Sequence, residues 1–320
     1  MFRNISDSSL KIKAQNNRNR PPIRDWDTTY HQRLTHIKLG CEKLTNKSTG
    51  PYMYTYKRFT VDDVHKILYC EIPKVGTSIW RYTLLHTTGK LRTTNLSLIN
   101  DLGTKLSIYV KSLGLIRSLS SYSQTEKTER LKTYFKFLFV RHPFERLLSA
   151  YLDKIVRKYD KGYAKLEPMI IRSVRNHFKP GDRATFKEFA EFILLHSYND
   201  IHWAPYEKLC RPCDIDYSFI GKYGDTIEND FKLVQNRFHL EPELAKTATL
   251  PHTYSSEKLN KYYKDLPQKL IDDLYEEYKA DFILFDYDVY WYCQPVLLVD
   301  NVDIDIRPEL LSTSAIGRQC

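Results

Sequence analysis

The chain has 320 residues, of which 42% are hydrophobic, and its formal net charge is +10 at pH 7. This length permits one large domain or two small ones around a substantial core. The positive charge favours an anionic partner, such as a nucleotide, a polyanionic glycan, a nucleic acid or a membrane surface. No apolar run approaches the roughly 20 residues that cross a bilayer, and the polar stretch 1–24 lacks the apolar core of an ordinary signal peptide.

The predicted elements begin after a long lead-in. Residues 1–60 are basic, weakly periodic and rich in Asn, Arg, Lys and Thr, which predicts a poorly ordered, stem-like segment. The apolar run 67–72 ends at Pro73 and predicts a buried strand. A helix is expected over 77–86, and residues 87–130 are typical of a variable insertion with room for one helix.

Strands and helices continue to alternate along the second half of the chain. Residues 134–140 predict a second strand, and Pro143 suits the first turn of a helix that runs to about residue 158. A third short strand is expected over 217–220. Further helices are expected at 166–178, 185–197, 225–238 and 266–280. This alternation predicts an α/β fold with a mainly parallel sheet flanked by helices.

The patterns divide the chain into the lead-in 1–60, a domain over 61–295 and a C-terminal tail over 296–320. Six cysteines leave the redox compartment open, since their pairing cannot be deduced from sequence. They are Cys41, Cys70, Cys210, Cys213, Cys293 and Cys320. The triplets that begin at Asn4, Asn46 and Asn95 fit the N-glycosylation pattern and favour a secretory lumen.

Two segments carry the strongest functional signal, and each joins an apolar strand to a helix. The first is Glu71–Trp80, which reads EIPKVGTSIW, and the second is Phe137–Tyr151, which reads FLFVRHPFERLLSAY. A helix N-terminus with free backbone N–H groups binds anions readily. Two such sites on successive strands indicate a ligand with phosphate at both ends.

In the first segment Lys74 precedes Gly76, so the pattern differs from a Walker A loop. Gly76 would let the backbone approach an anion closely, and Thr77 and Ser78 would add hydroxyl donors. The Lys74 cation suits the bridging oxygen of a 5′-phosphosulfate, where leaving-group charge accumulates. Taken alone, such a turn also has many structural uses.

In the second segment Arg141 ends the strand and Ser149 lies eight residues further on. Both could reach a second phosphate, because a guanidinium gives planar, multiple contacts to phosphate oxygens. For Ser149 the alternative is a helix-face hydroxyl without a ligand. Glu145 and Arg146 are interpreted as a solvated or salt-bridging face.

The order and spacing of the two segments resemble the 5′-phosphosulfate loop and the 3′-phosphate motif of sulfotransferases that use 3′-phosphoadenosine 5′-phosphosulfate (PAPS). The residues of the two segments are most similar to those of membrane-bound carbohydrate sulfotransferases of the chondroitin/dermatan 4-O-sulfotransferase type. Two further blocks agree, at residues 202–223 and 274–282. The resemblance covers about residues 66–290.

The resemblance implies a P-loop-like sulfotransferase fold, with PAPS as co-substrate and no metal. Carried over to this sequence, the phosphosulfate would be contacted by Pro73, Lys74, Val75, Gly76, Thr77, Ser78 and Ile79. The 3′-phosphate would be held by Arg141 and Ser149. The chain departs from that branch at residues 77–79, where Thr-Ser-Ile stands in place of the usual Cys-Thr-Asn. Since Cys210-x-x-Cys213 lacks the further ligands that a zinc site needs, a disulfide or another structural role is preferred there.

The resemblance also implies an acceptor and a cellular place. The acceptor would be a sugar hydroxyl of a glycan, either a chondroitin/dermatan-like glycosaminoglycan or a glycoprotein glycan with terminal N-acetylgalactosamine or glucuronic acid. No nucleic-acid partner is implied. The expected location is the Golgi lumen or the Golgi membrane.

The catalytic base is the part of the pattern that this sequence does not supply. Related enzymes often carry His-Val-Ser between the two motifs, where this chain has Tyr-Val-Lys-Ser at 109–112. A tyrosine with an ordinary pKa near 10 is a poor base at neutral pH. The remaining candidates are His202, His86 and His142. His202 is preferred because it follows a polar turn and adjoins Trp203, which could stack on a sugar.

Two alternatives remain open at this point. The missing His-Val-Ser motivates a pseudoenzyme that binds PAPS or a glycan without transferring sulfate. The net charge alone motivates a basic nucleic-acid-binding domain, whose affinity would depend steeply on salt.

Overall fold

The computed structural model describes residues 28–44, 52–90, 113–157, 161–196, 200–224, 226–238 and 256–288. Within these residues the chain forms a five-stranded sheet of order β3-β1-β2-β4-β5. The strands are β1 (Phe59–Asp62), β2 (Ile67–Cys70), β3 (Arg117–Ser118), β4 (Phe135–Val140) and β5 (Phe219–Lys222). Strand β4 pairs in parallel with β2 and β5, whereas β1 pairs antiparallel with β2 and β3.

The predicted α/β class with a mainly parallel sheet is confirmed. Because β1 is antiparallel to both of its neighbours, the other four strands run in one direction. Every residue of β2 and all but the first of β4 are buried. Burial on both faces of the sheet explains why these strands read as continuous apolar runs in the sequence.

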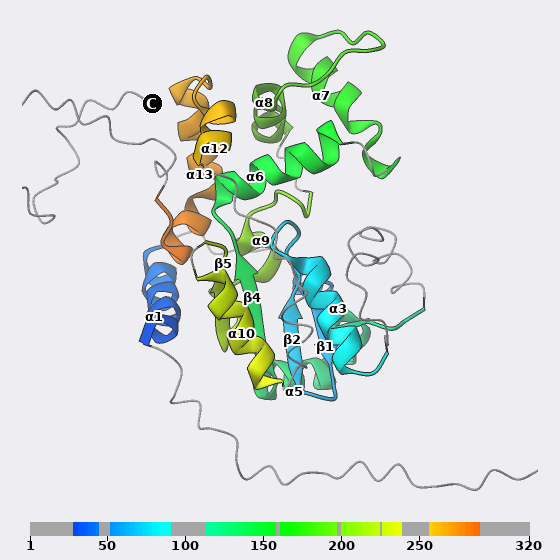
Figure 1. The fold of residues 1–320 in the computed structure, drawn as a ribbon, viewed down its shortest axis with the longest axis vertical. Coiled ribbons are helices and arrows are strands. Elements are labelled where there is room, and N and C mark those ends of the chain that lie inside the picture. Colours follow the sequence, from blue (N-terminus) through cyan, green and yellow to red (C-terminus); the bar gives the residue numbers. More distant parts are fainter. Residues whose placement is uncertain are drawn as a thin grey trace, which may run out of the picture.

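Helices surround the sheet and extend beyond one end of it (Figure 1). They are α1 (Thr28–Lys43), α2 (Tyr52–Tyr56), α3 (Thr77–Thr87), α5 (Gln124–Thr133), α6 (Pro143–Tyr151), α7 (Leu166–Arg175), α8 (Phe186–His196), α9 (Tyr206–Cys210), α10 (Ile227–Arg237), α12 (Ser256–Tyr263) and α13 (Gln268–Phe285). A π-helical stretch, Leu152–Val156, continues α6. Short 3₁₀ turns occur at Leu119–Ser121 and Lys161–Tyr163.

The described residues form two apolar cores. One core surrounds the sheet, where Trp80 of α3 lies 4.3 Å from Phe231 of α10 and 4.8 Å from Phe137 of β4 between ring centroids. The other fills the space between α6, α7, α8, α12 and α13. In Figure 1 helix α6 starts where β4 ends and crosses above the sheet toward α7 and α8. The carboxyl ends of β2, β4 and β5 therefore face this second group of helices.

The expectation that residues 1–60 are poorly ordered is wrong for 28–44 and 52–60, which contribute α1, α2 and the start of β1. Helix α1 is fixed by tertiary contacts rather than by its own periodicity. The Arg33 guanidinium lies 2.7 Å from the buried Asp230 carboxylate, and the Tyr30 hydroxyl donates to the same carboxylate at 2.9 Å. Most helical stability in proteins comes from such packing, so weak periodicity misled the prediction.

The other predicted elements agree with the structure within a few residues, except that the third strand begins at Phe219 instead of residue 217. Helices α9 and α12 and strands β1 and β3 had no clear signal in the sequence. The sequons at Asn4, Asn46 and Asn95, the stretch 109–112 and the tail 296–320 lie outside the described residues.

Two disulfides tie distant segments to the sheet. Cys70 at the end of β2 pairs with Cys210 at the end of α9, and Cys41 in α1 pairs with Cys213. The preference for disulfides at Cys210 and Cys213 is confirmed, although the two cysteines do not pair with each other. Each bond joins residues at least 140 positions apart, which restricts the unfolded chain strongly.

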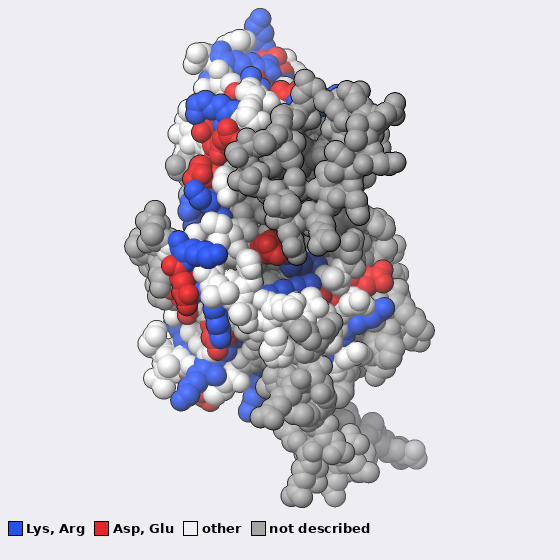
Figure 2. All heavy atoms as spheres, turned by 90° about the vertical axis from the view of Figure 1, so that its left-hand side faces the viewer, with Lys and Arg blue, Asp and Glu red and all other residues white. Residues whose placement is uncertain are grey.

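No helix in the described part of the chain is both long and apolar enough to cross a membrane. On the face shown in Figure 2, Lys and Arg side chains are interspersed with Asp and Glu rather than gathered into one basic surface.

Candidate active site

The first candidate anion-binding segment is a tight turn between β2 and α3. Lys74 and Gly76 both adopt left-handed backbone conformations, with φ of 75° and 81°. The carbonyl of Gly76, the N-cap of α3, accepts hydrogen bonds from the N–H groups of Ile79 and Trp80 at 3.0 and 3.2 Å. No side chain caps this helix, so the earliest N–H groups of α3 remain available to an anion.

Glycine is favoured at position 76 for two independent reasons. Its φ of 81° is unfavourable for residues with a side chain. In addition, a Cβ atom there would lie 2.3 Å from the hydroxyl oxygen of Tyr223.

We expect Gly76→Ala to lower donor affinity at least tenfold and to lower the melting temperature, because the turn must change shape. Isothermal titration with adenosine 3′,5′-bisphosphate and thermal unfolding would measure both effects. Gly181→Ala is a matched control, since Gly181 also has a positive φ, of 98°, but a Cβ atom there would meet no atom within 4 Å. Parental affinity in Gly76→Ala would show that the anion does not depend on this turn.

Lys74 points toward a cluster of charged side chains. Its Nζ lies 2.9 Å from Oδ2 of Asp153, and the Lys154 Nζ lies 3.5 Å from the same oxygen. Burial lowers the pKa of Lys74, while Asp153 acts in the opposite direction. For Asp153 burial alone would raise the pKa, but Lys74, Lys154 and His202 together outweigh it and the net pKa is lowered. Asp153 and Lys154 both belong to the π-helical stretch after α6, a local structure that is frequent at functional sites.

The second segment lies beside the first. Arg141 follows the last residue of β4 and is 2% exposed, and its Nε donates to Glu145 Oε2 at 2.6 Å. Arg141 is close enough to Lys74 for its charge to contribute to lowering the pKa of Lys74. Ser149 lies within α6 and is also buried. The structure thus brings the Lys74 turn and the Arg141 strand end together at neighbouring strands.

Glu145 and Arg146 do not form a solvated face. Glu145 pairs with Arg141, as the salt-bridging interpretation allowed, but it is buried, and burial raises its pKa. Arg146 is only 2% exposed. It donates to the carbonyls of Pro73 at 3.2 Å, Ala204 at 2.7 Å and Ile201 at 2.9 Å. Arg146 therefore joins the Lys74 turn to the 201–204 loop.

Replacing Arg146 by methionine is expected to lower the free energy of unfolding by about 3 kcal/mol, because three carbonyls in the interior lose their donor. Chemical denaturation would measure this loss. Arg172→Met is a surface-helix comparison on α7 and should change stability by no more than about 0.5 kcal/mol. An equally small change in Arg146→Met would show that the three contacts add nothing to stability.

Of the three histidine candidates, two lie in unsuitable places. Burial lowers the pKa of His142 to about 3. Its Nε2 bonds to the Asp288 carbonyl at 2.8 Å, and its Nδ1 accepts the Phe144 N–H at 3.2 Å as the cap of α6. His86 lies nine residues beyond Thr77 on α3, about 14 Å along the helix from the anion site.

His202 has the surroundings of an oriented base. Its Nδ1 lies 2.6 Å from Asp200 Oδ1, and the Tyr163 hydroxyl donates to Asp200 Oδ2, also at 2.6 Å. Donation from Nδ1–H to Asp200 leaves Nε2 as the acceptor nitrogen. Burial lowers the pKa of His202, Asp200 opposes this shift, and the charges of Lys154 and Lys74 add to it. His202 thus lies near the Lys74 cluster and is neutral at pH 7.

The expectation that Trp203 stacks on a sugar is wrong. Trp203 is 1% exposed, and its ring centroid lies 5.2 Å from that of Phe189 within the second core. Its role is to pack the loop that carries His202.

Sequence reasoning missed several residues that border this site. Tyr223, Asp153, Lys154, Tyr163 and Asp200 lie in separate parts of the chain, and tertiary folding brings them together. Two local signals were available: Asp153 follows Ser149 by four positions, which is one helical turn, and Asp200 precedes His202 by two.

Comparisons with known proteins identify the family of this chain. The sequence profile described as "Sulfotransferase family" matches residues 57–288, which include both anion-binding segments and His202. Carbohydrate sulfotransferase 10 of Homo sapiens is 34% identical over 276 residues, covering 81% of this chain and 75% of that protein. The same protein of Rattus norvegicus is 32% identical over 304 residues, covering 89% and 82%. Carbohydrate sulfotransferase 11 of Rattus norvegicus is 31% identical over 246 residues, covering 73% and 68%.

No solved structure matches this chain. The extent of the profile match and the identity to these relatives over most of both chains establish the family. The chain is a member of the sulfotransferase family, of the carbohydrate sulfotransferase type.

Proposed function

We propose that this protein transfers the sulfuryl group of PAPS to a sugar hydroxyl of a glycan. The observation that carries the proposal is the pair of anion-binding segments at the ends of the adjacent strands β2 and β4. A nucleotide with phosphate at both ends would place its 5′-phosphosulfate at the turn from Pro73 to Ile79. Its 3′-phosphate would lie at Arg141 and Ser149.

The residues of the site supply the parts of an in-line transfer. The sugar oxygen forms a bond to sulfur while the bond from sulfur to the bridging phosphate oxygen breaks. Lys74 would stabilise the negative charge that develops on that bridging oxygen. Nε2 of His202 would take the proton from the sugar hydroxyl, and Asp200 would hold the imidazole in the required tautomer. The scheme uses no metal ion.

In the free protein Lys74 is paired with Asp153, so donor binding must compete for its ammonium group. The same applies to Arg141, which is paired with Glu145. A ligand with several negative charges can compete with a single carboxylate at each position, whereas a singly charged anion is a weaker competitor.

The acceptor is proposed from two observations. The relatives are named carbohydrate sulfotransferases, and the chain carries a formal charge of +10. The names favour a glycan acceptor, and the positive charge favours an anionic one, such as a chondroitin/dermatan-like chain. Glycans with terminal N-acetylgalactosamine or glucuronic acid are further acceptors to test. The interspersed charges in Figure 2 give no support to a nucleic-acid partner on that face.

We also propose that the protein works in the Golgi lumen or at the Golgi membrane. Disulfides persist in oxidising compartments, and two of them stabilise the described fold. The three sequons in the sequence fit the glycosylation that proteins undergo in the same pathway.

The proposal is tested by incubating the purified protein with ³⁵S-labelled PAPS and a panel of acceptors. The panel contains desulfated chondroitin and dermatan, and oligosaccharides that end in N-acetylgalactosamine or glucuronic acid. We expect labelled glycan and adenosine 3′,5′-bisphosphate in equal amounts. Nucleotide binding without transfer to any acceptor would favour a pseudoenzyme. Failure to bind the nucleotide at all would contradict the donor assignment.

A further inference from the structure

Tyr223 lies where the two anion-binding segments meet, at the end of a third strand. It follows β5 directly, and its N–H donates to the carbonyl of Val140 at the end of β4, at 2.8 Å. Its side chain is buried, with 5% exposure. Residue 223 is thus fixed to the same strand end from which Arg141 emerges.

The side chain of Tyr223 extends between the two segments. Its hydroxyl oxygen abuts Gly76, at 2.3 Å from the place that a Cβ atom would take. The guanidinium carbon of Arg141 lies 5.8 Å from the centre of its ring. One tyrosine therefore contacts the N-terminus of α3 with its hydroxyl and approaches the second segment with its ring.

The hydroxyl of Tyr223 has no hydrogen-bond partner within the part of the chain that the structure describes. Buried hydroxyl groups are normally paired, because water that would otherwise bond to them is excluded. The polar groups at the end of β5 follow that rule, although the buried hydroxyls of Tyr69 and Tyr287 also have no partner among the described residues.

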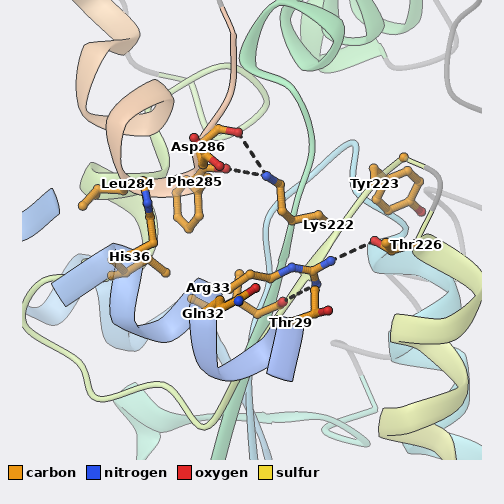
Figure 3. Close-up of a pocket in the computed structure, with 13 residues that line it drawn as sticks. Thr29, Gln32, Arg33, His36, Lys222, Tyr223, Thr226, Leu284, Phe285 and Asp286 are labelled. Atoms are coloured by element: carbon orange, nitrogen blue, oxygen red, sulfur yellow. Dashed lines mark hydrogen bonds between the residues drawn. The ribbon is translucent and has the colours of Figure 1, made fainter. Parts of the chain in front are cut away.

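A cavity of about 430 Å³ lies beside the end of β5. Figure 3 shows that Lys222 donates to the Phe285 carbonyl at this cavity and that Arg33 donates to Thr226. Tyr223 is one of the residues that line this cavity.

An uncapped helix N-terminus and an unpaired buried hydroxyl thus meet at Gly76. Both are hydrogen-bond donors without an acceptor among the described residues, since burial raises the pKa of Tyr223 and keeps its phenol protonated at neutral pH. The missing partner must accept hydrogen bonds, as an anionic oxygen does.

We infer that Tyr223 is a further donor-binding residue, whose hydroxyl donates a hydrogen bond to the 5′-terminal anionic group held at the N-terminus of α3. The inference rests on the proposed function, because it takes the ligand to be a nucleotide with a phosphate at each end. It adds β5 to the site, so that three consecutive strands of the sheet supply donor contacts. It also explains why the position that faces this hydroxyl is occupied by glycine.

The test is Tyr223→Phe, which removes the hydroxyl and keeps the ring beside Arg141. Its affinity is measured by calorimetry for adenosine 3′,5′-bisphosphate and for adenosine 3′-monophosphate, which lacks the 5′ group. We expect about tenfold weaker binding of the bisphosphate and unchanged binding of the monophosphate. Unchanged binding of both ligands, or equal weakening of both, would overturn the inference.

Thermal unfolding of the free protein separates this role from a structural one. Tyr223→Phe removes an unpaired buried hydroxyl, so its melting temperature should equal or exceed that of the parent. Tyr217→Phe is the matched control, because the Tyr217 hydroxyl donates to the Cys210 carbonyl at 2.7 Å. This control should melt lower than the parent and bind both nucleotides normally. If the parent protein itself binds no adenosine 3′,5′-bisphosphate, the proposed function is contradicted, and the experiment then says nothing about Tyr223.

Discussion

Replacing Lys74 by alanine is expected to lower kcat for sulfuryl transfer by about 100- to 1000-fold, the usual loss when one preorganised group at a developing charge is removed. Lys74 occupies a strained left-handed position, with φ of 75°, at the turn that precedes the anion site. Strained backbone of this kind is retained where the surrounding structure fixes it, and it clusters at functional sites. The rate is measured with labelled PAPS at saturating donor and acceptor.

Donor affinity should fall much less than kcat, by about tenfold or less, because the N–H groups of α3, together with Arg141, would still bind the nucleotide. Lys269→Ala is the control for removing a lysine, since Lys269 is 84% exposed on α13 and pairs with Asp273 on the same helix. It should transfer sulfate at the parental rate. A Lys74→Ala variant that retains full kcat would remove Lys74 from the mechanism.

A double variant separates the loss of the Lys74 charge from the effect of leaving Asp153 without its closest partner. Removing Lys74 leaves the Asp153 carboxylate without its 2.9 Å partner in a partly buried place. Lys74→Ala combined with Asp153→Asn removes both charges and should restore the melting temperature without restoring kcat. If the double variant recovers turnover, the loss in Lys74→Ala came from the Asp153 carboxylate that had lost its closest cation, with only Lys154 left at 3.5 Å.

The two strand-turn-helix segments were predictable because their information is local. An apolar run followed by Pro73 and Gly76, or by Arg141 and Pro143, determines where a strand ends and a helix begins. Parallel strands then place successive turns at one edge of the sheet. These rules were sufficient to predict that Lys74 and Arg141 approach each other.

The N-terminal elements could not be predicted in this way. Helix α1 has weak amphipathic character and lacks an acidic first turn. Its place depends on Asp230, which lies about 200 positions away, and on the Cys41–Cys213 disulfide. Contacts of this range leave no periodic signal in the segment itself.

Helix α6 shows a different limit of sequence reasoning. All nine of its residues are buried, and its apolar side chains pack in the second core with those of α7, α8, α12 and α13. The assumption that charged residues mark a solvated face therefore failed for Arg146, which bonds to three backbone carbonyls. The prediction that Trp203 stacks on a sugar also failed, because an aromatic residue next to a candidate base packs inward as readily as outward.

His202→Ala is expected to lower kcat/KM for the acceptor by about 100-fold or more, the usual contribution of a positioned general base. The imidazole is held by Asp200 at 2.6 Å, and it lies near the cluster of Lys74, Asp153 and Lys154. His86→Ala is the matched control, since His86 lies toward the far end of α3, and it should keep the parental rate. Parental transfer by His202→Ala would exclude His202 as the base.

The pH dependence of kcat/KM distinguishes a catalytic role of His202 from a purely structural one. A base must be neutral, and burial lowers the pKa of His202 from its ordinary value of 6.5. The acid limb of kcat/KM in the parent should therefore lie below pH 6.5, with activity lost as pH falls through that limb. Asp200 opposes the shift, so Asp200→Asn should move the limb to still lower pH and also reduce the plateau, because the imidazole loses the partner that sets its tautomer. An acid limb that stays in place in Asp200→Asn would mean that a different group, such as the Asp153 carboxylate beside Lys74, controls the proton.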